Sequence, residues 1–172
     1  MLQYRKIQIE PSQFGQSGAK EYLPQLLALS RDWAEEKTCP AYYANEEEDF
    51  LDKDIYVALD DERIVAYAYG EIRELTEATS YNQVGEKAFD LEELYVVPAL
   101  RDRGVGKALY RFMEEQIRDR LDVIGVTAVS YQYEKLLRFY IQELGFGFKY
   151  AQLAKRAGQS PAPTQRGAAA FE

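Results

Sequence analysis

Apolar residues recur along most of the chain, either at every second position, as in a strand, or at the three-to-four-residue spacing of a helix face. The order of these segments is typical of a mixed α/β domain. The stretch 124–131 is so apolar and β-branched that we expect it in the middle of the sheet. The expected elements are strand 2–9, helix 20–37, strands 55–59, 63–73 and 88–97, helix 104–121, strand 124–131, helix 134–144 and strand 146–153.

The residues between and at the ends of these segments predict how the segments connect. A short acidic turn, 60–62, joins two strand-like runs, which is a hairpin signal. Strands 88–97 and 124–131 are separated by a helix, so we expect them to be parallel and joined by a right-handed crossover. Pro24 is tolerated only near a helix start, so the first regular helix is expected to begin close to it. Glycine closes the helix 134–144 at Gly145.

The most informative stretch is the turn between strand 88–97 and the helix that follows. Pro98 ends the strand because it has no backbone N–H for a ladder. Gly104 and Gly106 leave the first helical amides bare, at the positive end of the helix dipole. Two arginines and a lysine add positive charge to this turn. The arrangement predicts an anion site, most simply for a phosphate group.

These residues also carry a resemblance to a known family. The run 98–106, Pro-Ala-Leu-Arg-Asp-Arg-Gly-Val-Gly, resembles the R/Q-x-x-G-x-G/A cofactor motif of the GNAT family of N-acetyltransferases. The later run 137–146, Leu-Arg-Phe-Tyr-Ile-Gln-Glu-Leu-Gly-Phe, is similar to the family's segment A-x-x-L-Y-x-x-x-G-F. The two runs lie in the family's order and near its separation. One departure is that Tyr133 and Leu136 stand where the family often has asparagine and a small residue.

The resemblance implies the GNAT acyl-CoA acyltransferase fold, in which helices flank a mixed central sheet with two splayed parallel strands. It implies acetyl-CoA as the acyl donor, with its pantetheine arm between those strands. Backbone groups of the strand would bind the pantetheine like an added strand. The implied cofactor-binding residues are Leu94, Tyr95, Val96, Arg101, Asp102, Arg103, Gly104, Val105, Gly106, Lys107 and Ala108.

Acyl transfer to an amine also needs proton chemistry: the ammonium must lose a proton, and the departing thiolate gains one. The chain has no histidine, so carboxylates and tyrosines must do this work. Strand alternation predicts that Asp90 and Glu92 share a face with Leu94 and Val96, while Glu93 points the other way. By its position in the resemblance Glu92 is the expected general base, with Asp90 and then Glu93 as alternatives.

Tyr140 matches the family's tyrosine near the cofactor sulfur, so the resemblance implies that it is the acid that protonates the thiolate. The residue also lies on an apolar helix face, where it would be an ordinary core side chain. That face comprises Leu136, Leu137, Tyr140, Ile141 and Leu144.

The composition of the chain narrows the expected substrates, cofactors and cellular location. The 172 residues carry a net charge of −8, which disfavours a general nucleic-acid binder and suits cationic substrates. With a single cysteine, Cys39, and no histidine, neither an internal disulfide nor a metal site is expected. No apolar run is long enough to span a membrane and no leader pattern is present, so a cytoplasmic location is expected. We expect one domain over 1–157 and a disordered tail over 158–172, where small and polar residues dominate.

The sequence therefore predicts an acetyl-CoA-dependent N-acetyltransferase that acts on a small cationic amine, of polyamine or aminoglycoside type. Acetylation of a protein N-terminal or lysine amine is the alternative within the same fold. A non-catalytic acyl-CoA-binding module is the alternative of another class. Many family members dimerise, so the resemblance allows a homodimer.

Overall fold

The computed structural model describes residues 1–10, 19–79 and 81–153. Its centre is a sheet of five strands in the order β1-β2-β3-β4-β5. The first four strands are antiparallel neighbours, and β4 pairs with β5 in parallel. The expected hairpin 55–73 is confirmed as β2 and β3. The strands are β1 Gln3–Ile7, β2 Ile55–Asp60, β3 Arg63–Glu74, β4 Lys87–Val96 and β5 Val123–Val126.

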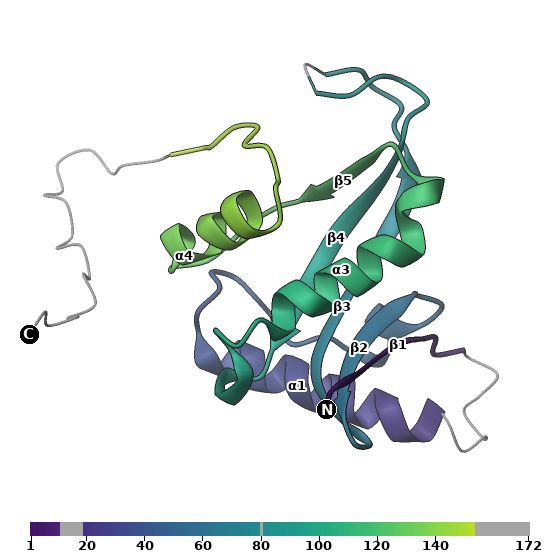
Figure 1. The fold of residues 1–172 in the computed structure, drawn as a ribbon, viewed down its shortest axis with the longest axis vertical. Coiled ribbons are helices and arrows are strands. Elements are labelled where there is room, and N and C mark those ends of the chain that lie inside the picture. The colour runs from purple at the N-terminus through teal and green to yellow at the C-terminus, as the bar shows by residue number, and fades with distance from the viewer. Residues whose placement is uncertain (11–18, 80, 154–172) are drawn as a thin grey trace, which may run out of the picture.

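Helices cover both faces of this sheet (Figure 1). The buried side chains of α3, Val105–Ile117, pack on one face with Leu91 and Phe89. Those of α1, Ala19–Glu36, pack on the other face, in a cluster that includes Tyr67 and Tyr95. The remaining helical segments are α2 Glu47–Phe50, the 3₁₀ turns Pro98–Leu100 and Arg118–Arg120, α4 Tyr133–Leu137 and the π-helix Arg138–Glu143.

Helix α1 begins at Ala19, before the position that Pro24 suggested. Pro24 lies inside the helix on its exposed side, where water can replace the hydrogen bond that proline removes from the ladder. The expectation that the regular helix begins near Pro24 is therefore wrong. Helix α4 and the π-helix together span 133–143, close to the expected range 134–144, and Gly145, with φ +83°, follows their end.

Strands β4 and β5 pair over a short distance only. The ladder runs from Ala88 opposite Val123 to Leu91 opposite Val126. There β5 ends, while β4 continues through Glu92–Val96 with β3 alone as its partner. Figure 1 shows the two strands together at one end and diverging toward α4. The predicted parallel pair and its splay are both present.

Of two strands predicted at the C-terminal side, 124–131 is confirmed only over its first residues, as β5, and 146–153 is wrong. Strand β5 lies at the edge of the described sheet, and residues 127–131 continue as an irregular segment. This segment is held by hydrogen bonds to the loop that follows α1, Tyr131 N–H to Thr38 O at 2.9 Å among them. The run 146–153 forms no strand; Phe146 packs against Tyr110 and Tyr140, Lys149 contacts Tyr81, and Tyr150 is largely exposed. The tail 158–172 lies outside the described residues.

A bulge in β4 changes which side chains share a face. Tyr69 of β3 lies opposite Glu93 and Gly70 lies opposite Leu91, so Glu92 is an extra residue in β4. As a result Leu91 and Leu94 both face α3, and Glu93 faces α1 together with Tyr95. The prediction that Glu93 points away from Glu92, and that Glu92 shares a face with Leu94, is wrong. Simple alternation fails because the extra residue inverts it.

Gly70 makes the bulge possible. A Cβ on Gly70 would lie 2.1 Å from the backbone oxygen of Asp90 and 2.8 Å from Cζ of Phe89. No side chain fits in that space, so the two strands approach each other closely only because residue 70 is glycine.

Candidate active site

The glycine turn has the geometry of an anion site. Gly104 caps α3 with φ +78°, a conformation that glycine adopts without strain. The first hydrogen bond of the helix runs from Ala108 N–H to Gly104 O at 2.9 Å. The backbone amides of Val105, Gly106 and Lys107 therefore precede the ladder and are available to a ligand. Arg103 is exposed beside them.

Gly106 lies where three elements meet. A Cβ on this glycine would lie 3.4 Å from Val96 and 3.6 Å from both Leu94 and Phe139. The glycine turn thus lies next to the π-helix and next to the end of β4 that has β3 but not β5 as its partner. Of the predicted cofactor residues on β4, the side chains of Leu94 and Val96 therefore lie beside Gly106, whereas Tyr95 is buried on the other face of the sheet.

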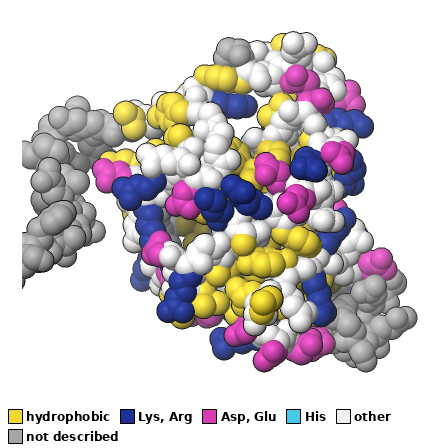
Figure 2. Space-filling model, viewed as in Figure 1, with side chains coloured by type: hydrophobic (Ala, Val, Ile, Leu, Met, Phe, Trp, Pro, Cys, Tyr) yellow, Lys and Arg dark blue, Asp and Glu magenta, His cyan; other side chains and the backbone are white. Residues whose placement is uncertain are grey.

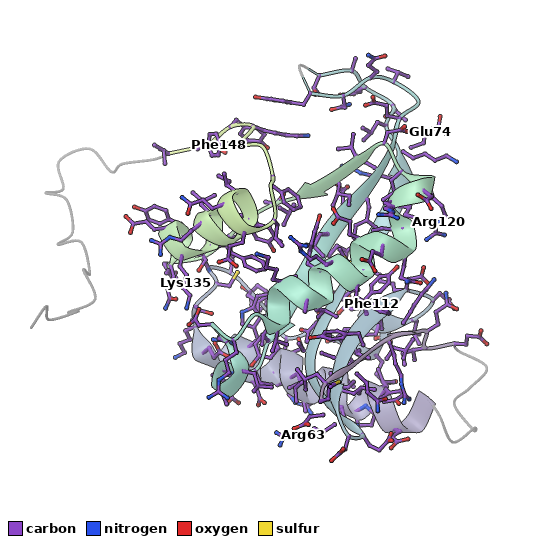
Figure 3. The ribbon with its side chains drawn as sticks, in the orientation of Figure 1. Arg63, Glu74, Phe112, Arg120, Lys135 and Phe148 are labelled. Carbon is purple, nitrogen blue, oxygen red and sulfur yellow. The ribbon has the colours of Figure 1, made fainter. Side chains whose placement is uncertain are left out.

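Arg101 and Asp102 are engaged within the protein. The guanidinium of Arg101 pairs with both oxygens of Glu36, at 2.7 and 2.8 Å, and its Nε donates to Val96 O at 2.8 Å. Asp102, with φ +59°, accepts from Lys135 Nζ at 2.8 Å. Lys135 comes from α4 (Figure 3), so this pair links the turn to the α4 side of the splay.

Glu93 is the one carboxylate buried on β4, with 8% of its surface exposed. Its Oε2 accepts from Tyr67 Oη at 2.7 Å and from Asn45 Nδ2 at 3.0 Å. Burial raises the pKa of Glu93, and these hydrogen bonds lower it without cancelling the effect of burial. The raised pKa brings this carboxyl toward the range in which a general base works.

The predicted base, Glu92, and its first alternative, Asp90, are more exposed than Glu93 and are paired with cations. Glu92 accepts from Lys53 Nζ at 2.9 Å, and its side chain is 35% exposed. Lys53 also pairs with Glu71, and its Nζ lies 5.0 Å from the ring centre of Tyr69. Asp90 pairs with Arg73. The structure gathers these carboxylates on the α1 face of β4, the same face as Glu93.

Tyr140 is buried in the cluster on the α3 face, against Phe139 and Phe146. Desolvation raises its pKa to about 12, so the hydroxyl keeps its proton at neutral pH. Its neighbour Phe139 touches the position of Gly106. Tyr140 therefore lies near the turn, on the opposite face of the sheet from Glu93.

The residues that hold Glu93 have no counterpart among the sequence predictions. Ser30 Oγ accepts from Asn45 N–H at 2.8 Å and shares a hydrogen bond with Tyr42 Oη at 2.8 Å. Asn45 and Tyr67 then reach Glu93. A partial signal exists in the run 66–70, Ala-Tyr-Ala-Tyr-Gly, which places tyrosines on one face of a strand and alanines on the other. Nothing local in the sequence identifies Asn45.

Comparison with known proteins agrees with this geometry. Residues 22–146 match the model of the Acetyltransferase (GNAT) family. The match covers well over half of the chain, so the protein belongs to this family of acetyltransferases, as the two motifs predicted. A search of curated proteins gives no match.

Solved structures share the fold at low sequence identity. A predicted acetyltransferase from Clostridium acetobutylicum, solved with acetyl-CoA, is 15% identical with a TM-score of 0.61 over 91% of this chain and 96% of that one. An aminoglycoside acetyltransferase from an uncultured soil metagenomic sample is 17% identical, with a TM-score of 0.63 and coverage of 91% and 98%. A ribosomal-protein-alanine N-acetyltransferase from Brucella melitensis biovar Abortus 2308 is 13% identical, with a TM-score of 0.61 and coverage of 92% and 100%. The predicted acyltransferase fold is confirmed.

Other features of the described residues lie away from this site. One hollow of about 290 Å³ lies between α3 and Leu144, and another of about 330 Å³ lies beside Arg73 and Arg120. Within 1–10, 19–79 and 81–153, no set of three or more Cys, Asp or Glu side chains is arranged for a metal, and no helix has the length and apolarity of a membrane span. Basic and acidic side chains are interspersed on the face in Figure 2.

Proposed function

We propose that this acetyltransferase transfers an acetyl group from acetyl-CoA to a primary amine of a small cationic molecule. The observation that carries the proposal is the position of Glu93. A buried, hydrogen-bonded carboxylate lies at the bulge where β4 loses its partner β5, on the strand that leads into the glycine turn.

The residues present fit acetyl-CoA. Bare amides and a helix N-terminus at Val105–Lys107 suit its pyrophosphate, and Arg103 and Lys107 add charge. The unpaired edge at Leu94–Val96 offers backbone groups to an amide-containing arm in the manner of an added strand. Bound acetyl-CoA supplies an activated acetyl thioester. Of the predicted cofactor residues, Arg101 and Asp102 would contribute through backbone groups, because their side chains are paired internally.

Glu93 is proposed as the general base, in place of Glu92. An amine arrives as an ammonium ion and must lose a proton before it has a lone pair. The buried carboxylate of Glu93 can accept that proton directly or through one water, while Tyr67 and Asn45 hold its Oε2. Glu92, already paired with Lys53, then sets the charge around the approaching amine.

Tyr140 is retained as the proposed acid. Its protonated hydroxyl lies beside Phe139, near the turn, and can deliver a proton to the leaving sulfur from the α3 face. Base and acid then approach the open edge of β4 from opposite faces of the sheet. Tyr140→Phe keeps the ring and removes the proton, so an unchanged kcat in this variant would refute the role.

Cationic substrates are favoured by the side chains around Glu93. Carboxylates of Glu71, Asp90 and Glu92 face the same way as tyrosines 67 and 69, and acidic residues of α2 lie nearby. Acid and aromatic groups together attract ammonium groups. An aminoglycoside acetyltransferase and a ribosomal-protein-alanine acetyltransferase share the fold, so a protein amine is the second candidate. A cytoplasmic location and a homodimer stay predictions.

The first experiment is the thermal midpoint with and without acetyl-CoA, in the parent and in Gly106→Glu. Ligand at 100 times its Kd adds about 2.7 kcal/mol, a rise of several degrees for this size of domain. The glutamate would place charge and bulk among Leu94, Val96 and Phe139, so the rise should disappear. No shift at millimolar acetyl-CoA contradicts the proposal; a shift without thiol release for any amine supports a binding module instead.

A further inference from the structure

The first arginine of the glycine turn is not free to meet a phosphate. Every nitrogen of the Arg101 guanidinium already donates a hydrogen bond: Nε to Val96 O, and the two terminal nitrogens to the two oxygens of Glu36. The guanidinium also lies 5.3 Å from the ring centre of Tyr95. Burial alone would lower the pKa of Arg101, but the Glu36 carboxylate outweighs it and raises that pKa. The charge is therefore satisfied within the protein.

The pair also stabilises Glu36, whose position in α1 is unfavourable for a carboxylate. It is the last residue of α1, where the helix dipole is negative and a carboxylate is unfavourable. The last turn of α1 contains no basic residue that could offset the charge. Arg101 supplies the missing cation from the cofactor turn, and Tyr95 Oη adds a hydrogen bond to Glu36 at 2.9 Å. The side chains of Arg101 and Glu36 are only 34% and 18% exposed.

From this pair, packed side chains lead to the proposed base. The ring of Tyr95 packs on Trp33, with centroids 5.5 Å apart, and Trp33 packs on Tyr42 at 4.2 Å. Tyr42 bonds Ser30, which fixes the backbone of Asn45, and the Asn45 side chain donates to Glu93. One continuous set of contacts thus joins the end of the cofactor turn to the carboxylate at the bulge.

We propose that Arg101 is a positioning residue. Its bidentate pair with Glu36 fastens the cofactor turn to the packed side chains that lead to Glu93, called here the aromatic wall: Trp33, Tyr42 and Tyr95. This inference rests on the proposed function, and it assigns phosphate binding to the backbone amides of the turn with Arg103 and Lys107. Two parallel hydrogen bonds to one carboxylate need the planar fork of arginine, so lysine cannot replace it.

The chain provides its own reporter, because Trp33 is its only tryptophan and lies within this set of contacts. We would compare Arg101→Gln, Glu36→Gln, their double variant and Arg101→Lys, with Arg111→Gln as a matched control from the exposed side of α3. The measurements are the Kd of CoA by calorimetry, the emission spectrum of Trp33 and the thermal midpoint.

If the Arg101–Glu36 pair positions the aromatic wall, Arg101→Gln and Glu36→Gln change the Kd of CoA by the same factor, within twofold. Each shifts the Trp33 emission by a similar amount, and the double variant adds nothing to either. Arg101→Lys behaves like Arg101→Gln, and Arg111→Gln behaves like the parent.

The inference is overturned if Arg101→Gln weakens CoA binding tenfold or more while Glu36→Gln leaves it unchanged or strengthens it. That result would make the guanidinium a phosphate ligand, which Glu36→Gln would set free. It is also overturned if neither variant moves the Trp33 emission. Failure of the parent to bind CoA at all contradicts the proposed function instead, and the emission and the additivity of the midpoints then still decide on the pair.

Discussion

Strands β3 and β4 bury side chains on both faces, but the two faces are built from different residues. Toward α3 the strands present alanine, leucine and phenylalanine, and few polar atoms need partners. Toward α1 they present Tyr67, Tyr69, Tyr95 and Glu93, and three of these bond one another or Glu36. Tyr56, on the α3 face, marks the contrast, because its buried hydroxyl has no hydrogen-bond partner among the described residues.

This difference separates the residues that stabilise the fold from those that can take part in proton transfer. An apolar face contributes to folding by burial alone and tolerates no charge. A face with hydroxyls and a carboxylate is stable only while each polar group is satisfied, and it can shift the pKa of the group it surrounds. Variants of the side chains that the strands themselves bury should therefore differ in kind: those toward α1 chiefly alter activity and its pH dependence, and those toward α3 chiefly alter the free energy of unfolding.

Removing the proposed base should have the largest effect. Glu93→Gln is expected to lower kcat/KM by about 10²–10⁴, the usual contribution of a general base. It should not lower the thermal midpoint at pH 7.5. The folded-state pKa of Glu93 lies above the unfolded one, so its favourable contribution to stability is present at low pH and is lost as pH rises through the folded-state pKa. A neutral glutamine avoids that loss.

Glu92→Gln is the matched control for this prediction. It removes an exposed, Lys53-paired carboxylate one residue away and should keep kcat/KM within about threefold of the parent. Both variants are assayed by thiol release from acetyl-CoA over pH 5–9, with an amine that the parent acetylates. The reverse ranking, with Glu92→Gln inactive and Glu93→Gln active, would return the role of base to Glu92.

Breaking the close approach at Gly70 should have the next largest effect. In Gly70→Ala the new methyl would meet the backbone of Asp90 at 2.1 Å, and strands cannot separate there without losing their ladder. We expect a loss of about 2 kcal/mol or more and a fall of roughly 5 °C in the thermal midpoint. Activity should fall as well, because the bulge aims Glu93.

Gly147→Ala provides the control, since nothing lies within 4 Å of the added methyl. It should change the free energy of unfolding by less than about 0.5 kcal/mol. Equal midpoints for the two alanine variants would show that the bulge adapts, and that Gly70 is not needed to place Glu93.

Much of this arrangement is present in the sequence, for identifiable reasons. The turn 98–106 and the helix after it are local features, so their strand-turn-helix geometry follows from Pro98, Gly104 and the apolar spacing. The splay followed from family resemblance alone. The bulge at Glu92 could not be predicted, because it depends on Gly70 in another strand, and it reversed the faces of the candidate bases.

The failed strand predictions have a similar cause. The run 124–131 has strand composition throughout, but pairing ends at Val126, where β4 and β5 diverge. Composition at 146–153 also favours a strand, but no neighbouring strand in the described sheet pairs with it. Whether such a segment forms a strand depends on a neighbouring strand that can pair with it, and a single sequence does not show which strands are neighbours. Asn45 was missed, and the pairing of Arg101 with Glu36 was not foreseen, because the partners Glu93 and Glu36 are distant in sequence.

The smallest predicted effect compares single hydroxyl groups on the two faces. Tyr67→Phe removes a hydrogen bond that lowers the pKa of Glu93, so that pKa should rise further. The acid limb of kcat/KM then moves to higher pH, and the deficit relative to the parent shrinks as pH increases. The lost hydrogen bond should also cost about 1 kcal/mol of stability.

Tyr56→Phe removes the unpartnered hydroxyl on the α3 face and should do the opposite. It leaves the pH profile unchanged and keeps or slightly raises the thermal midpoint, because an unsatisfied buried hydroxyl is unfavourable. If the acid limb stays in place in Tyr67→Phe, Glu93 does not control the pH dependence and the polar face is structural only. If it moves equally in both variants, the effect is general to the sheet, and the contrast between the two faces fails.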